Sequence, residues 1–104
     1  MIISLRNLSG ERKKYRVLDI RPRVRQLIYV IEPPFKKMEE ERQSGSNRYR
    51  DLEFDRIYEI YRVHNTTQIL IRDNVGSIVH LYRSQYRIVE ELTAIESTLL
   101  DKHR

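Results

Sequence analysis

The 104-residue chain lacks cysteine, contains only three glycines and three prolines, and has no long uninterrupted apolar run. The absence of thiols excludes a disulfide framework and thiolate zinc sites. No apolar run comes near the roughly 18 residues that a membrane-spanning helix requires, so we expect no membrane association. The N-terminal segment lacks the charge order and the apolar length of a signal peptide, and a cytoplasmic location is therefore the expectation.

Motifs for catalysis or cofactor binding are also missing. The glycines are too widely scattered to form a loop that cradles phosphate groups, and no serine lies in a nucleophile-elbow motif. His64, His80 and His103 are too far apart in the sequence to suggest a shared metal ion, and no cysteine can complete such a set. We therefore predict a non-enzymatic protein without catalytic residues, metal, cofactor or small-molecule substrate.

One enzyme class stays open because it requires no local motif. Small ribonuclease toxins are basic, similar in size and free of cysteine, and they depend on scattered Arg, Lys, Tyr and His side chains. General acid–base cleavage of RNA needs only such groups near the 2′-hydroxyl and the leaving oxygen. The chain carries no pattern of a specific toxin, so ribonuclease activity is the third of three hypotheses.

Positive charge is concentrated in the N-terminal third. The net charge is +5, and charged residues make up 34% of the chain. Residues 1–30 contain eight Lys or Arg against two acidic residues, residues 31–53 contain five against six, and residues 54–104 contain seven against seven. The excess therefore belongs to the first 30 residues. A localised cationic face favours an anionic partner, either nucleic acid or an acidic protein.

The arginines and lysines of this third are candidates for binding such a partner. Pro22 cannot donate to a sheet, so the segment around it is an edge, a bend or a strand start. If this segment is extended, Arg21, Arg23 and Arg25 point to one side with a spacing of about 6.6 Å, close to the step between successive phosphates. The competing interpretation is a solvated strand face whose arginines discourage edge pairing. The candidate residues are Lys13, Lys14, Arg16, Arg21, Arg23 and Arg25.

The seven tyrosines can either stack on unpaired bases or pack at the margins of the core. Most lie inside predicted strands, which favours packing. Tyr49 is the exception, because it stands between Arg48 and Arg50 in a predicted loop, and these three residues join the candidate site. Since Arg and Tyr also dominate protein–protein hot spots, they do not distinguish a nucleic acid from a protein partner.

The segment from Phe54 to Val89 organises the predicted fold. Its runs of Ile, Val and Tyr are interrupted at short intervals by turn residues, which is typical of consecutive β-strands. Connectors of two to four residues require antiparallel pairing of neighbours. We predict one α+β, mainly β domain over residues 1–104: an antiparallel meander or partly open barrel of six to seven strands, similar in architecture to SH3-like barrels. The predicted strands cover 2–6, 14–20, 24–32, 56–63, 67–72, 77–83 and 86–89, with a loop or short helix within 33–51.

A C-terminal helix is predicted over residues 90–103. Leu92, Ile95 and Leu99 recur with helical spacing. Glu90 and Glu91 would occupy the first turn, where the helix dipole favours negative charge. The apolar stripe is expected to pack against the sheet.

The leading functional hypothesis is a small basic module whose arginine-rich N-terminal face docks on RNA or DNA without strong sequence preference. The alternative is a regulatory protein that docks on a larger protein complex and adapts or inhibits it, as phage-encoded host modulators do. An uncovered edge at residues 2–5 or 21–25 would permit a homodimer through strand pairing. The first hypothesis fails if the cations are dispersed over the molecule or paired with the acidic residues 39–41.

Overall fold

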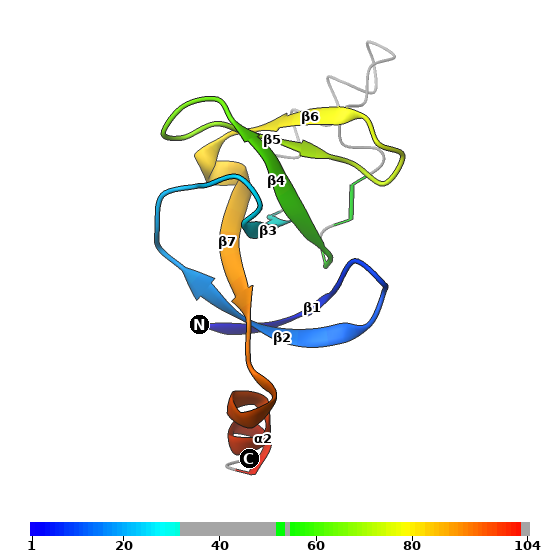
Figure 1. Ribbon diagram of the computed structural model, residues 1–104, viewed down its shortest axis with the longest axis vertical. Coiled ribbons are helices and arrows are strands. Elements are labelled where there is room, and N and C mark those ends of the chain that lie inside the picture. Colours follow the sequence, from blue (N-terminus) through cyan, green and yellow to red (C-terminus); the bar gives the residue numbers. More distant parts are fainter. Residues whose placement is uncertain (32–51, 54, 103–104) are drawn as a thin grey trace.

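The computed structural model describes residues 1–31, 52–53 and 55–102. This part of the chain forms seven strands, a 3₁₀ turn and a C-terminal helix, which confirms the predicted mainly β fold of the α+β class (Figure 1). In chain order the elements are β1 (Ile2–Arg6), β2 (Arg12–Leu18), β3 (Leu27–Val30), β4 (Ile57–Val63), β5 (Ile69–Arg72), β6 (Ile78–Leu81), η1 (Arg83–Gln85), β7 (Tyr86–Glu91) and α2 (Ala94–Lys102).

The strands form one antiparallel sheet in the order β1-β2-β7-β3-β4-β5-β6. The sheet is open, with β1 and β6 as its edges, but it curls until the end of β1 reaches the start of β4. There the Arg6 N–H donates a hydrogen bond to the Asp55 carbonyl oxygen at 2.8 Å, and Arg6 forms an isolated parallel bridge with Arg56. The result is a partly open barrel.

The prediction of a four-stranded meander is wrong in its last strand. β4, β5 and β6 pair consecutively, but β7 pairs with β2 and β3 instead of β6. The reason is η1, which redirects the chain after β6. The buried Gln85 holds this turn: its side-chain oxygen accepts the Tyr82 N–H at 2.9 Å, and its carbonyl oxygen accepts the Ile31 N–H at 2.9 Å.

The prediction for strand 2–6 is confirmed, whereas the next two strands differ from expectation. β2 begins and ends two residues earlier than predicted, and β3 is reduced to four residues. Residues 21–25 form no strand, because Pro22 and a turn at Val24–Arg25 interrupt the extended chain. The dimer predicted through 2–5 stays a prediction, since β1 is an edge strand, but 21–25 offers no strand for pairing.

Asparagine and aspartate side chains close the hairpin turns. The Asn7 side-chain oxygen accepts the backbone N–H groups of Ser9 and Glu11, and Asn65 does the same for Thr67 and Gln68. Such bonds mimic a backbone turn, which is why these residue types favour these positions. The turn residues therefore determine the local hairpins, whereas the order of the strands in the sheet depends on contacts elsewhere in the fold.

The core consists of two clusters, and β3, β4 and β7 contribute to both of them. On β7, Ile88 belongs to the cluster that includes β5 and β6, and Val89 belongs to the cluster that includes β1 and β2. Ile28, Ile60 and Ile88 are fully buried, and burial of each such side chain stabilises the fold by about 1.5–3 kcal/mol. β7 is thus the strand that joins the two halves of the sheet.

The C-terminal helix begins later than predicted and packs less than predicted. Glu90 and Glu91 belong to β7. The helix is started by Thr93 and Glu96, whose side chains each bond the backbone N–H of the other residue, at 3.1 and 3.2 Å. This is a capping box.

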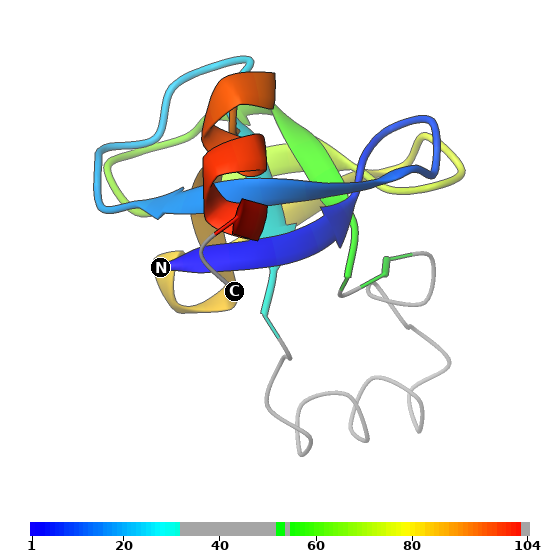
Figure 2. The same cartoon turned by 90° about the horizontal axis from the view of Figure 1, so that it is seen from below.

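Leu92 is buried, but Ile95 and Leu99 are 75% and 52% exposed. The expectation that the whole stripe packs on the sheet is therefore wrong. Figure 1 shows α2 extending beyond the end of β7, and Figure 2 looks along this direction with α2 in front of β1 and β2. None of the helices in the described residues is long and apolar enough to cross a membrane.

Candidate nucleic-acid interface

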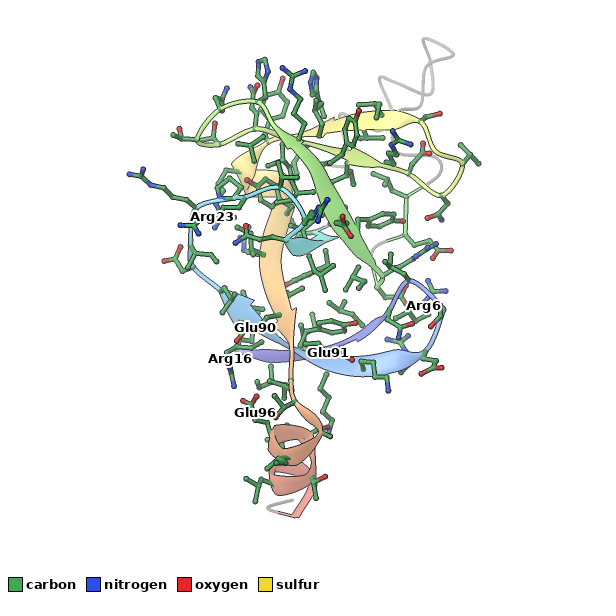
Figure 3. The ribbon with its side chains drawn as sticks, in the orientation of Figure 1. Arg6, Arg16, Arg23, Glu90, Glu91 and Glu96 are labelled. Carbon is green, nitrogen blue, oxygen red and sulfur yellow. The ribbon has the colours of Figure 1, made fainter. Side chains whose placement is uncertain are left out.

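The predicted basic face is divided between two regions with different surroundings. Lys13, Lys14 and Arg16 lie on β2, whereas Arg21, Arg23 and Arg25 lie in the loop between β2 and β3. Figure 3 shows Arg16 near the α2 end of the molecule and Arg23 well away from it. The two groups must therefore be considered separately.

Arg16 and Lys13 of β2 are paired with carboxylates. β7 lies beside β2 in a register that places Glu90 directly opposite Arg16. The Arg16 guanidinium forms ion pairs with Glu96 and with Glu90, the latter at 2.8 Å, and these partners raise its pKa (Figure 3). Lys13 lies 3.6 Å from the Glu11 carboxylate. These carboxylates neutralise much of the charge that the sequence predicted for this part of the surface.

A second paired cluster lies where β1 meets the segment before β4. Arg6 contacts Glu53 and Asp55 at 2.7 and 2.6 Å, and Arg12 contacts the second Asp55 oxygen at 2.8 Å. The Arg6 hydrogen bond, followed by the positive charges of Arg6 and Arg12, lowers the pKa of the Asp55 carboxyl. Because this cluster joins β1 to the segment before β4, its arginines have a structural role.

The loop arginines are exposed. Within the described ranges, no carboxylate pairs with Arg21, Arg23 or Arg25. The evenly spaced row required an extended segment, and the chain instead bends at Val24–Arg25, which was one of the alternatives for this segment. The Gln26 side-chain oxygen accepts the Arg23 N–H at 2.6 Å, and Arg25 adopts a left-handed backbone conformation with φ of 74°.

Two further arginines lie beside this loop, although they belong to the segment 54–104, whose positive and negative charges are equal in number. Arg83 of η1 lies 3.8 Å from Asp19 at the start of the loop. Arg83 and Arg87 both donate to the Tyr86 carbonyl oxygen, at 3.1 and 2.8 Å, which fixes their orientation. One shallow depression includes Asp19, Arg21 and Arg23, and the adjoining one includes Asp19, Arg83 and Arg87.

We call these five residues the loop surface: Arg21, Arg23, Arg25, Arg83 and Arg87. Asp19 is the single acidic residue lining either depression in the described part of the chain. Counting the described residues alone, the loop surface therefore carries an excess of positive charge. Sequence reasoning missed Arg83 and Arg87 because only the β6–β7 connection brings them next to the loop.

The tyrosines divide into two classes. Four are buried, as the packing interpretation predicts, and burial raises the pKa of three of them, Tyr15, Tyr58 and Tyr86. Tyr61 and Tyr82 are instead 50% and 43% exposed. The described tyrosines thus include two whose rings are accessible to a ligand.

Three of the predicted site residues, Arg48, Tyr49 and Arg50, lie outside the described residues, as do the acidic residues 39–41 and the predicted helix at 35–43. Among the side chains that are described, no group of three His, Asp or Glu is arranged to hold a metal ion.

No protein family model, curated protein or solved structure matches this chain. The loop surface must therefore be interpreted from its own chemistry.

Proposed function

We propose that this protein is a non-enzymatic module that docks on nucleic acid through the loop surface, without strong sequence preference. The observation that carries the proposal is the gathering of four arginines, Arg21, Arg23, Arg83 and Arg87, around the single acidic residue Asp19 in the described part of the chain. Arg25 lies on the same loop and is exposed. Guanidinium groups bind phosphate oxygens well because their donors match the geometry of the anion.

The same arrangement explains the expected lack of sequence preference. Arg21 and Arg23 are exposed side chains on a loop, and phosphate contacts of this kind position a backbone without reading its bases. Each neutralised phosphate releases counterions, so the logarithm of the binding constant falls with the logarithm of salt concentration by about 0.9 per contact on duplex DNA. Five contacts would give a slope of at most about −4 to −5.

The test is a salt titration of a fluorescent oligonucleotide with two charge-matched variants. R21Q/R23Q removes two charges from the loop surface, and R12Q/K13Q removes two from the paired β1–β2 hairpin. We expect the loop variant to lower the salt slope by about two and the affinity at moderate salt by about tenfold. The hairpin variant should stay within about twofold of the wild type.

Equal losses in both variants would mean that only net charge matters, and wild-type binding by the loop variant would remove the loop surface from the proposal. Thermal unfolding of each variant establishes that it is folded.

In a separate test for ribonuclease activity, total RNA should stay intact when it is incubated with a stoichiometric amount of the protein. Specific cleavage would replace the proposed binding function with the ribonuclease hypothesis.

A second candidate function is docking on a larger protein complex, and the exposed apolar stripe of α2 favours it. Ile95 and Leu99 are unusually exposed for helical apolar residues, and the groove between α2 and β1 includes Ile2, Leu92 and Leu100. The test is a pull-down from nuclease-treated lysate with wild type and I95S/L99S. A specific partner lost in the variant supports this function, and identical capture by both proteins contradicts it.

A further inference from the structure

The outward side of β4, β5 and β6 forms a second surface beside the loop surface. The register places Arg62 opposite Leu70, and Leu70 opposite His80, so these three side chains project from the same side of the sheet. The alternate residues Ile69 and Ile71 point to the opposite side and are fully buried in the core. The side that carries Arg62 and His80 is therefore the solvent-facing one.

A β-bulge in β4 adds one more exposed side chain to this side of the sheet. The pairing of β4 with β5 shifts register between Ile60 and Arg62. Ile60 is buried, whereas Tyr61 and Arg62 are both exposed. Bulges re-aim side chains in this way, and here the bulge places an aromatic ring and a guanidinium side by side on the surface.

Most of the exposed side chains of this region are aromatic, cationic or imidazole, and Ile78 adds an apolar one. The Arg72 guanidinium lies over the Tyr61 ring at 4.7 Å, and the His64 and His80 rings have centroids 5.8 Å apart. We call this set the meander face: Tyr61, Arg62, His64, Arg72, Ile78, His80 and Tyr82. Glu59 and Asp73 lie beside Tyr61 and Arg72 at one end of it, so the cationic character increases toward Arg62.

The loop surface and the meander face are neighbours. The Arg25 N–H donates to the Ile60 carbonyl oxygen at 2.9 Å, and the Ile60 N–H donates to the Gln26 carbonyl oxygen at 2.9 Å. These bonds attach the arginine loop to β4 at the residue before Tyr61. A chain of phosphates bound at the loop can therefore continue onto the outward side of β4.

We propose that the meander face selects single-stranded nucleic acid, with bases stacking on Tyr61 while Arg62 and Arg72 contact the backbone. This inference rests on the proposed function, because the loop surface supplies the phosphate contacts. Aromatic side chains on a sheet are stacking platforms for unpaired bases of any sequence. In a duplex the base faces are already stacked inside the helix, so the same ring has nothing to stack on.

The test compares binding of a single-stranded oligonucleotide and a duplex of equal length at one salt concentration. Wild type should prefer the single strand, and Y61L, which removes the aromatic face but keeps an apolar side chain, should lose about tenfold in single-strand affinity. Duplex affinity and salt slope should be unchanged in Y61L. The matched control is Y61F, which keeps the ring and should bind as the wild type does.

Failure of this inference is distinguishable from failure of the proposed function. If Y61L binds single strands like the wild type while R21Q/R23Q still loses affinity for both forms, the meander face plays no part and the loop surface stands. If neither variant changes binding, both proposals are wrong. Because Tyr61 is half exposed, Y61L should keep the unfolding temperature of the wild type, and a large decrease would contradict its placement on the surface.

Discussion

The β1–β2 hairpin and the β2–β3 loop are both rich in arginine, but the structure gives their charges different partners. In the hairpin, Arg16 faces Glu90 because β7 is the neighbour of β2, and α2 adds Glu96. The loop extends past the ends of the strands, so no strand brings a carboxylate against Arg21 or Arg23 within the described residues. Whether a cation is available to a ligand therefore depends on its strand neighbours as much as on local charge density.

The largest expected effect comes from the turn that brings two arginines to the loop. Q85A would leave the partly buried Tyr82 N–H without its side-chain acceptor and would remove a buried side chain, which destabilises the protein by about 1–3 kcal/mol. Chemical denaturation measures this loss. Because η1 also carries Arg83, nucleic-acid affinity should fall in the folded variant, and unchanged affinity would mean that Arg83 is not part of the loop surface.

Removing the carboxylate partners of Arg16 should make the hairpin resemble the loop in its affinity for anions. E90Q/E96Q removes both carboxylates that contact Arg16, so the hairpin should become a second anion-binding region. We expect an increase of about threefold to tenfold in oligonucleotide affinity and a steeper salt dependence. The control is the triple variant R16Q/E90Q/E96Q, which also removes the cation that these carboxylates contact, so most of the increase should be lost. An equal increase in this control would attribute the gain to net charge alone.

The loop offers a way to separate stability from binding. Arg25 has a φ of 74°, where a side chain costs about 1 kcal/mol and glycine costs little. R25G should therefore match or exceed the wild type in thermal stability while binding oligonucleotide a few-fold more weakly. R23G, at a residue without positive φ, should be less stable than wild type. A marked loss of stability in R25G would contradict the strained conformation.

The smallest expected effect is a dependence of stability on acidic pH that belongs to the paired region. The Arg6 hydrogen bond lowers the pKa of Asp55, and the Thr93 N–H, together with Arg16, lowers the pKa of Glu96. Both groups therefore contribute stability above their unfolded pKa values, near 4. This contribution is lost as pH falls through the lower folded values.

Thermal unfolding between neutral pH and about pH 3 measures this change. E96Q should be less stable than wild type at neutral pH, and the difference should shrink in acid. R21Q/R23Q should retain the wild-type profile, because these arginines have no carboxylate partner among the described residues. If the loop variant altered the pH profile, Arg21 or Arg23 would have a carboxylate partner, and the contrast between the two regions would be wrong.

Part of the candidate site was predictable from the sequence. Arg21, Arg23 and Arg25 were named from the sequence and lie exposed on one loop, but the course of that loop was not predictable, because it depends on Pro22 and on the turn at Val24–Arg25. The start of α2 was predictable, because Thr93 and Glu96 are three residues apart, as in a capping box. Glu90 and Glu91 were instead placed in the first turn, and the predicted helix therefore began too early. Tyr61 could not be identified as exposed, because its position depends on a bulge that regular alternation does not reveal.

The sequence by itself determined the mainly β character, most strand positions and the hairpin turns, because alternation and turn chemistry act between residues close in the chain. Only the tertiary structure decided which arginines are neutralised and which are available. That outcome depends on β7 lying between β2 and β3, a contact between segments about 70 residues apart in the case of Arg16 and Glu90. Charge is a property of composition, but electrostatic potential at a surface depends on distances that only folding establishes.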